Sequence, residues 1–476
     1  MKNSTSLFKK NKTSNVRHYI VLMSFTVLAI ILIGRLLELR LDKREFLISK
    51  AHKQYVKIET MPAHRGRIFD RNGELLAISV KSKSVYVRPK EFITEKHRWA
   101  QLEKLLNQKE NYLTKRVEDR MSLPFVYLQP RSISPQVFDK ISSLNLKGLF
   151  FEDSFTRFYP SKNQMSHLIG FSGDDQRGQE GLELLYDHVL SGKPGSRKVY
   201  LDAKKNIFKE PKIIDMPTPG SDLTLTVDQR IQYIAARAAD EFKKYHEAKA
   251  VSIFIIDVFS GDVLAMANSP TFNPNNIKER TPNNVRNRSM TDTFEPGSTI
   301  KPFTISAALS TQQYDTNTKV NTSPGHARLG SWPVKDAKDF GVLTVRQILE
   351  KSSNIGAIRI SNSIKSAYFW QLLNDVGFGN QTGIMWPGES SGKLNFFEDW
   401  HSTEKASLTF GYGMSVTIAQ LARAYMVFAN GGCLLPLRVI KGNNYNEKYQ
   451  VLDSEVSEEI KNMLVSAVQF GTGKRS

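Results

Sequence analysis

A serine and a lysine three residues apart are the strongest candidates for covalent chemistry in this chain. Ser298 and Lys301 lie within the run Phe294–Phe303, which reads FEPGSTIKPF. A lysine that has lost its proton can accept the hydroxyl proton of a nearby serine, and the serine then becomes a nucleophile for acyl transfer. The spacing alone is weak, because a helix-capping serine beside a surface lysine has it too. The flanking Pro296-Gly297 and Pro302 strengthen the catalytic interpretation.

A polar triplet, Ser352-Ser353-Asn354, follows this pair further along the chain. A hydroxyl beside a Ser–Lys pair can carry a proton to a leaving amine. An asparagine amide can hold a substrate backbone carbonyl. On its own the triplet is better explained as the cap of a helix over Ile355–Ile364. Together with Ser298 and Lys301, it predicts that Ser352 is catalytic and that Asn354 binds substrate.

A helix that begins beside Ser298 would position the first pair. Pro296-Gly297 is typical of a turn, and Phe303–Leu309 has helical apolar periodicity. Pro302 is tolerated in a first turn, where its missing N–H has no helical partner. Lys301 would then lie one turn above Ser298 on the same face. The helix dipole would favour an alkoxide at Ser298 and, with burial, disfavour a protonated Lys301.

The composition narrows the classes of function. The chain has 476 residues and 40% hydrophobic residues, which suffices for sizeable cores. Its net charge of +19 comes without a nucleic-acid-binding motif, so we expect no nucleic-acid partner. The positive charge can instead reflect a solvated basic surface, or binding to a membrane surface or to an anionic polymer such as cell-wall glycan. Cys433 is alone and the nine histidines lack ligand spacing, so we expect no metal and no cofactor.

An apolar segment near the N-terminus predicts a membrane anchor. Residues from Tyr19 to Gly34 are uncharged and mostly apolar, and Arg35 can snorkel so that the helix extends to about Leu37. No small-residue cleavage site follows, which favours an uncleaved anchor over a signal peptide. Lys and Arg residues are balanced on both sides and do not set the orientation.

In the remainder of the chain, the pattern of predicted helices and strands changes at a Pro- and Gly-containing linker over residues 217–220. Before it we expect an α+β domain, and after it an α/β domain with a largely antiparallel sheet. The predicted elements are a helical stalk at 38–60, a hairpin turn at Asn72-Gly73, a strand at Leu223–Val227, a helix at Gln229–Tyr245 capped by Asp228, and a strand pair within 250–267.

The Ser298–Lys301 motif and the Ser352–Asn354 triplet together resemble a known signature. S-x-x-K followed by S-x-N is the active-site pattern of penicillin-binding proteins and serine β-lactamases. The chain as a whole is similar to a class B penicillin-binding protein of the division type, the FtsI family. Asn354 and Glu295 favour this type, because the elongation type usually carries S-x-D. The further matching stretches are Arg65–Ala77, Arg157–Pro160, Glu180–Glu183, Phe410–Gly413, Thr417, Gln420–Ala422 and Ala429–Gly432.

This resemblance implies an architecture and a location. We expect a single transmembrane helix, an α+β pedestal and a serine β-lactamase-like α/β transpeptidase domain. The expected divisions are a cytoplasmic tail at 1–18, an anchor at 19–37, a pedestal at 38–216 and a transpeptidase domain at 217–476. The protein would lie in the bacterial inner membrane with its bulk in the periplasm. Its expected partners are divisome membrane proteins, including a glycan polymerase.

The resemblance also implies a reaction. Ser298 would attack the penultimate D-alanine carbonyl of a peptidoglycan stem peptide and release the terminal D-alanine. An amine of a neighbouring stem would then resolve the acyl-enzyme and form a cross-link. β-Lactams would acylate the same serine. The Ser298 N–H would supply half of an oxyanion hole.

One expected feature is missing from the sequence. The family has a third motif, K-[ST]-G, and no such triplet occurs; the run Gly471–Ser476 has the wrong order. Either the sequence is a fragment of a longer gene, which we favour, or it is a natural truncation with an unpaired sheet edge. The alternative function is then a catalytically impaired division scaffold. A hydrolase or β-lactam sensor is disfavoured by the long pedestal. Arg65–Ala77 is structural or a partner surface, and we favour a structural role.

Overall fold

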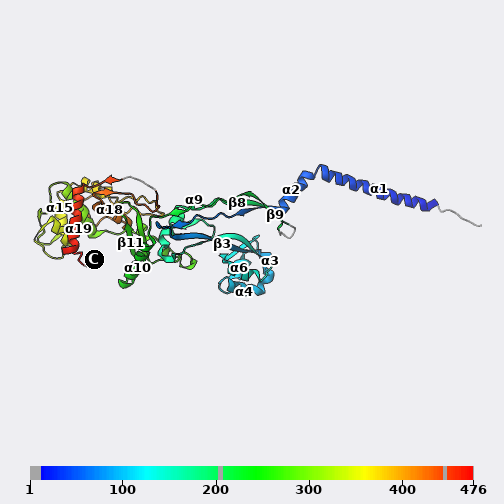
Figure 1. The fold of residues 1–476 in the computed structure, drawn as a ribbon, viewed down its shortest axis with the longest axis horizontal. Coiled ribbons are helices and arrows are strands. Elements are labelled where there is room, and N and C mark those ends of the chain that lie inside the picture. The colour runs from blue at the N-terminus through cyan, green and yellow to red at the C-terminus, as the bar shows by residue number, and fades with distance from the viewer. Residues whose placement is uncertain (1–11, 202–206, 443–447, 475–476) are drawn as a thin grey trace, which may run out of the picture. The chain divides into compact units, whose positions relative to one another are not determined.

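The computed structural model describes residues 12–201, 207–442 and 448–474. The chain forms two compact units (Figure 1). The N-terminal unit combines the stretch that ends at Met61 with the stretch from Pro194 to Pro217. The large unit contains Pro62–Lys193 and everything from Thr218 onward. Each unit is therefore built from two separate parts of the sequence.

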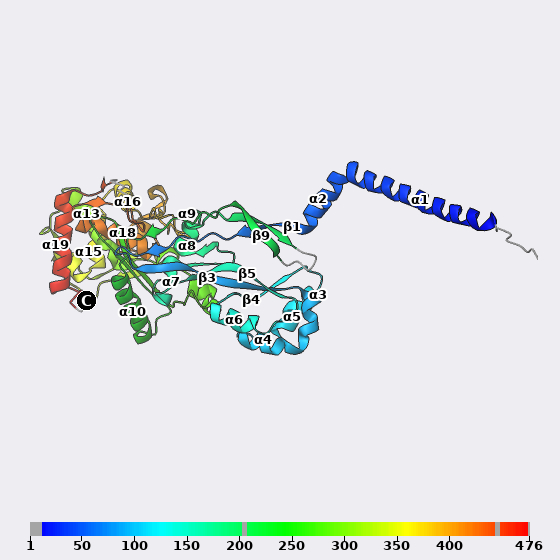
Figure 2. The same cartoon turned by 45° about the vertical axis from the view of Figure 1, so that its right-hand side comes forward.

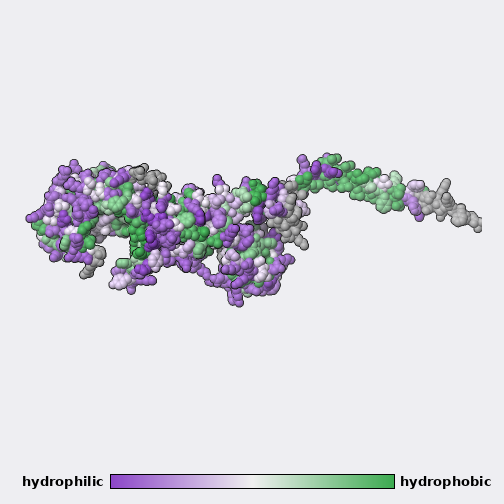
Figure 3. All heavy atoms as spheres, in the orientation of Figure 1, coloured by the Kyte–Doolittle hydropathy of each residue, from purple (hydrophilic) through white to green (hydrophobic). Residues whose placement is uncertain are grey.

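In its described residues, the N-terminal unit contains two helices and a three-stranded antiparallel sheet in the order β1-β8-β9. Its elements are α1 (Lys12–Leu41), α2 (Arg44–Tyr55), β1 (Val56–Met61), β8 (Gly195–Leu201) and β9 (Ile207–Asp215). Within α1, Val16–Leu41 is long and apolar enough to cross a membrane. Figure 3 shows the apolar surface that covers this helix. The helix extends beyond both ends of the predicted anchor.

The predicted helical stalk at 38–60 is wrong in its last part. Val56–Met61 forms strand β1, which pairs with β8 from Val56 opposite Tyr200 to Met61 opposite Gly195. The β-branched Val56 and Ile58 suit an extended strand. The partner strand lies more than a hundred residues away in the sequence, so no local sequence pattern could predict the pairing.

The first part of the large unit contains a five-stranded sheet around the long strand β3 (Figure 2). Its strands are β2 (Ile68–Phe69), β3 (Leu75–Val87), β4 (Val126–Ile133), β5 (Leu149–Phe158) and β10 (Leu223–Thr224). The predicted turn at Asn72-Gly73 is confirmed, because it joins the antiparallel strands β2 and β3 and Gly73 has φ +91°. Four helices pack beside β3 to β5: α3 (Pro89–Phe92), α4 (Trp99–Leu105), α5 (Tyr112–Val117) and α6 (Pro135–Ser142).

The strand predicted at Leu223–Val227 is shorter and belongs to this first sheet. Only Leu223 and Thr224 form β10, which pairs in parallel with β2. Thr226 instead donates its hydroxyl to the carbonyls of Val263 and Arg438, 2.9 and 2.8 Å away. The segment thus connects the two parts of the large unit, whose side chains share one apolar core.

The second part of the large unit begins with a helix packed on a β-hairpin. Helix α10 (Gln229–Tyr245) starts where predicted, and the Asp228 side chain accepts from Arg230 N. The hairpin strands β11 (Val251–Ile256) and β12 (Val263–Ser269) are antiparallel, as predicted. Among the described residues, the ladder of β11 joins β12 alone.

A helical cluster completes the large unit, with helix α13 near its centre. Nine of the ten residues of α13 are buried, from Lys301 to Leu309. The other elements that concern the site are η5 (Gly297–Ile300), α13 (Lys301–Ser310), β14 (His326–Leu329), β15 (Trp332–Lys335), α14 (Val345–Lys351), α15 (Asn354–Ser361), α16 (Ser366–Asp375), α17 (Ser402–Leu408), α18 (Ile418–Ala429) and α19 (Ser454–Phe470).

Candidate active site

Ser298 lies in the short 3-10 helix η5, which leads directly into α13. Gly297 has φ +59°, a conformation that glycine adopts without a steric penalty. Pro302 stands in the first turn of α13, where the missing N–H costs no helical hydrogen bond. The sequence prediction that Ser298 is adjacent to a helix N-terminus is confirmed.

Lys301 is fully buried, and its amine lies among three oxygen atoms. Nζ is 3.2 Å from Ser298 Oγ, 3.0 Å from Ser352 Oγ and 2.6 Å from the Ser352 carbonyl oxygen. Burial lowers the pKa of Lys301 to about 8, and the Asp336 carboxylate opposes this with a smaller raising influence. A lysine in this state can hold or release a proton near neutral pH.

Ser352 occupies the turn between α14 and α15. Its backbone is left-handed, with φ +55° and ψ +43°, and it is the C-cap residue of α14. Ser353 is the N-cap of α15 and accepts from Gly356 N. This turn directs both the hydroxyl and the carbonyl of Ser352 at the Lys301 amine. Three of the four predicted site residues therefore meet around one amine.

Asn354 stands apart from that group. It is the first residue of α15, and its Nδ2 donates to the carbonyl of Lys335 at 3.1 Å. Lys335 ends strand β15 of the β14–β15 hairpin. Asn354 therefore links the S-x-N turn to this hairpin.

Asp336 is a site residue that the sequence analysis missed. Its side chain is 8% exposed, and its two oxygens accept from Ser353 Oγ and Asn354 N, each at 2.6 Å, and from Ile355 N at 3.2 Å. It lies in a polar stretch, Val334–Phe340, that resembles an ordinary surface loop. Only the long-range contact with α15 identifies it.

A glycine-containing segment packs against the start of the nucleophile helix. Gly297 N donates to Gly411 O at 3.0 Å, and Glu295 accepts from Gly413 N at 3.1 Å. Tyr425 Oη donates to the Thr299 carbonyl at 2.7 Å. The stretch Phe410–Gly413, singled out in the sequence, thus holds the turn that carries Ser298.

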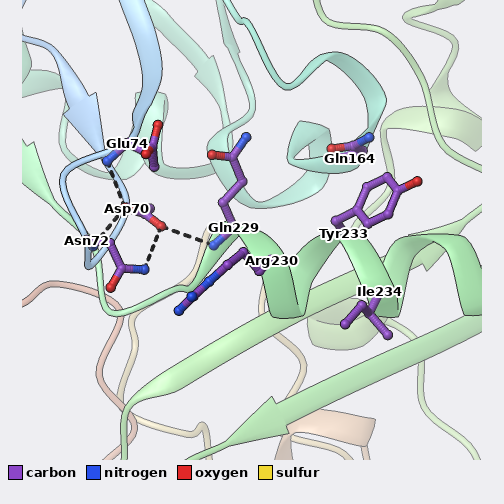
Figure 4. A pocket seen from close by; sticks show the side chains of 8 residues that line it. All are labelled: Asp70, Asn72, Glu74, Gln164, Gln229, Arg230, Tyr233 and Ile234. Carbon is purple, nitrogen blue, oxygen red and sulfur yellow. Dashed lines mark hydrogen bonds between the residues drawn. The ribbon is translucent and has the colours of Figure 1, made fainter.

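A cavity of about 620 Å³ lies elsewhere, where the Asn72-Gly73 turn meets α10 (Figure 4). Asp70 beside it is 1% exposed and accepts from Asn72 N, Glu74 N and Gln229 N at 2.7, 2.9 and 3.1 Å. One carboxylate thus closes the hairpin turn and caps α10. These contacts support the structural interpretation of Arg65–Ala77.

The geometry around Lys301 suits acyl transfer. An amine that contacts two hydroxyls can accept a proton from one and return it through the other. The start of a helix beside the nucleophile favours the negative charge of an oxyanion. This arrangement can support acyl transfer to a serine with a lysine as the base, which is the class of chemistry of the penicillin-binding enzymes.

Comparisons with known proteins agree with this class. The model of the Penicillin-binding Protein dimerisation domain matches residues 60–225, and that of the Penicillin binding protein transpeptidase domain matches residues 251–476. The probable peptidoglycan D,D-transpeptidase PbpC of Pseudomonas aeruginosa is 35% identical over 459 residues, 96% of this chain and 81% of the relative. The chain therefore belongs to the class B penicillin-binding proteins.

Further relatives extend the similarity. The peptidoglycan D,D-transpeptidase FtsI of Escherichia coli is 32% identical over 447 residues, 93% of this chain and 75% of the relative. The crystal structure of a peptidoglycan synthetase from Bifidobacterium adolescentis has a TM-score of 0.66 at 25% identity, covering 87% of this chain and 82% of that one. The predicted family and fold class are confirmed, and the scaffold alternative is not favoured.

Proposed function

We propose that this protein is a peptidoglycan D,D-transpeptidase that cross-links stem peptides through an acyl-Ser298 intermediate during septal wall synthesis. The observation that supports this proposal most directly is the buried Lys301 amine, which lies 3.2 Å from Ser298 Oγ and 3.0 Å from Ser352 Oγ. The PbpC and FtsI relatives are named peptidoglycan D,D-transpeptidases, which supports the substrate class. In this proposal the pedestal spans residues 38–216 and the catalytic domain begins at residue 217.

Acylation begins when Ser298 Oγ gives its proton to the neutral Lys301 amine. Oγ attacks the carbonyl carbon of the penultimate D-alanine, and the oxyanion forms beside the N-terminus of α13, where the Ser298 N–H stabilises it. Lys301 returns the proton through Ser352 Oγ to the nitrogen of the terminal D-alanine, which leaves. An ester between Ser298 and the stem peptide remains.

Deacylation repeats these steps in reverse order with a new amine. The amine of a neighbouring stem attacks the ester carbonyl and loses a proton to the Ser352–Lys301 pair. Collapse of the tetrahedral intermediate forms the cross-linking amide and returns the proton to Ser298 Oγ. Asn354 holds a backbone carbonyl of the stem peptide throughout. β-Lactams acylate Ser298 by the first half of the reaction.

The proposed location is the inner membrane, with residues 1–18 in the cytoplasm and the bulk of the chain in the periplasm. The apolar helix α1 supports a membrane anchor. The proposed partners are divisome membrane proteins, including a glycan polymerase. Protease added to spheroplasts should digest the protein outside the membrane and leave an N-terminal tag on residue 1 intact. Digestion of that tag would contradict the orientation.

Fluorescent penicillin tests the nucleophile. Membranes that contain the full-length protein should show a labelled band, and Ser298→Ala should abolish it. Ser310→Ala, at the last residue of α13, is the matched control and should label normally. Labelling that survives Ser298→Ala would rule out this nucleophile.

A further inference from the structure

We propose that the outward face of the β14–β15 hairpin binds carboxylate groups of the donor stem peptide, with Arg328 and Lys335 as the cations that hold them. The inference rests on the proposed function and extends it from the reacting D-alanines to an acidic part of the same substrate. The hairpin contacts the site through Lys335, whose carbonyl accepts from Asn354 Nδ2 at 3.1 Å. A peptide held by Asn354 therefore lies next to the hairpin.

The register of the hairpin places its basic side chains on one face. His326 lies directly opposite Lys335, and Arg328 follows two residues further along β14. Successive residues of a strand point to opposite faces, so Ala327 and Val334 belong to the other face. The three basic residues are exposed, whereas Ala327 and Val334 are half-buried. The sequence over 326–335 contains no aspartate or glutamate, so the outward face is entirely basic or uncharged.

The fold does not compensate this charge with carboxylates. Like charges on one face of a strand pair destabilise it, so an unpaired basic face carries a cost that an anionic ligand would offset. In the part of the chain that the structure describes, Arg328 and Lys335 form no ion pair. The nearest acids in the sequence serve other contacts: Asp336 is 8% exposed and accepts from the S-x-N turn, and Asp339 accepts from Ser323 Oγ. The face is therefore available to an anion from outside the chain.

A peptide that carries carboxylates matches this face in charge and in spacing. Guanidinium and ammonium groups bind carboxylates through charge-assisted hydrogen bonds. Arg328 and Lys335 are diagonal neighbours across the hairpin, which places their Cα atoms about 7–8 Å apart. Alternate residues of an extended peptide are separated by about 7 Å. Two acidic groups of one extended stem peptide can thus reach both cations.

The test measures how two synthetic pentapeptides compete with fluorescent penicillin for the full-length protein. Both peptides end in D-alanyl-D-alanine; one carries two free side-chain carboxylates, and in the other these groups are amidated. The measured quantity is the ratio of the two peptide concentrations that halve the labelling rate, and any effect of a variant on labelling itself cancels in this ratio. Wild type should require less of the acidic peptide, and this preference should weaken as salt increases.

Arg328→Gln and Lys335→Gln should each reduce the preference about two- to fivefold, as expected for the loss of one exposed ion pair. The double variant should lose most of it. Both positions are exposed, so the variants should keep the wild-type melting temperature. Lys461→Gln is the matched control, because it removes the same charge from an exposed position on α19, where Lys461 pairs with Glu458. It should keep the wild-type preference.

The outcomes separate this inference from the proposed function. Equal competition by the two peptides in wild type, an unchanged preference in the double variant, or an equal loss in Lys461→Gln would overturn the binding surface. The proposed function would stand in each case, because both peptides would still compete for Ser298. If neither peptide slowed the labelling of wild type, the proposed substrate class would fall, and this inference with it.

Discussion

At the scale of single residues, the burial of Lys301 links reactivity to stability. An ordinary lysine has almost no neutral amine at neutral pH, whereas a pKa of about 8 leaves about one-tenth of the molecules neutral at pH 7. In the remaining molecules the Lys301 amine is protonated, and its positive charge is not exposed to water. The proposed catalytic base is therefore held in a state that disfavours folding at neutral pH.

This state predicts a pH-dependent stability. The folded pKa of Lys301, about 8, is lower than the ordinary value of 10.5, so the unfolded chain binds more protons between these values. The free energy of unfolding should rise with pH across that window, by roughly 3 kcal/mol from this one group. Urea unfolding of wild type and Lys301→Met measures it. The difference between them should grow in favour of wild type as pH increases. A pH-independent difference would contradict the prediction.

Ser352 provides a second prediction at this scale. Ser352→Ala removes the hydroxyl 3.0 Å from Lys301 Nζ but keeps the carbonyl that also holds the amine. Acylation by penicillin should slow by about 10²-fold, as expected for the loss of a proton relay. Stopped-flow or gel-based labelling rates measure this. Ser363→Ala, just beyond the end of α15, should react at the wild-type rate. An unchanged rate in Ser352→Ala would exclude the relay.

At the scale of elements, close backbone contact between two segments shapes the nucleophile turn. A Cβ on Gly411 would lie 2.0 Å from the Gly297 carbonyl oxygen, and Gly411 also has φ +84°. Gly413 has a similar φ of +82°, but a Cβ there would meet nothing within 4 Å. Comparing an alanine substitution at each of the two glycines therefore distinguishes the effect of steric contact from that of backbone strain.

Gly411→Ala should slow penicillin labelling strongly and lower the melting temperature, because the backbone before Ser298 must move. Gly413→Ala should cost only the strain of the left-handed backbone, about 1 kcal/mol, and keep most of the labelling rate. Differential scanning fluorimetry and labelling rates measure both. Equal effects in the two variants would argue against the contact.

The sequence predicted the local contact of Ser298 with Lys301, and the combination of the two motifs also predicted that Ser352 lies near them, but the other long-range contacts were missed. Ser298 and Lys301 share one helical turn, so spacing and the flanking prolines were sufficient. Asp336 reaches α15 across a hairpin, and Gly411 reaches Gly297 across more than a hundred residues. Strand β1 was missed for the same reason, and so was the partner of the shorter strand β10, because each pairs with a strand remote in the sequence. Patterns of period and turn report local geometry only.

At the scale of the whole molecule, three of the family stretches meet in one buried ion cluster. Glu183 is fully buried and accepts from Arg65 Nε and Arg157 Nε, each at 2.6 Å. Asp187 also accepts from Arg65 Nη1 at 2.6 Å. The cluster joins β5 to the segments before β2 and within helix α8 (Gly181–Leu185). These stretches therefore specify the large unit's architecture.

Glu183→Gln should leave two buried guanidinium groups poorly compensated and destabilise the protein by about 3–5 kcal/mol. Chemical unfolding measures the loss. Asp153→Asn removes the exposed partner of Lys83 and should change stability by less than about 1 kcal/mol. The fraction of Glu183→Gln that remains folded should still label with penicillin. A small stability change in Glu183→Gln would show that the cluster contributes little.

The burial of α13 also has a consequence for the internal motions of the enzyme. Its amides are surrounded by the apolar cluster, so they can exchange with deuterium only when that cluster opens. The α13 amides should therefore be among the slowest to exchange, whereas those of the exposed β14–β15 hairpin exchange early. Acylation of Ser298 would then change exchange mainly in the hairpin and the S-x-N turn. We therefore expect the proposed nucleophile to lie beside one of the slowest-exchanging segments, and adaptation to different acyl donors to involve the hairpin and the S-x-N turn.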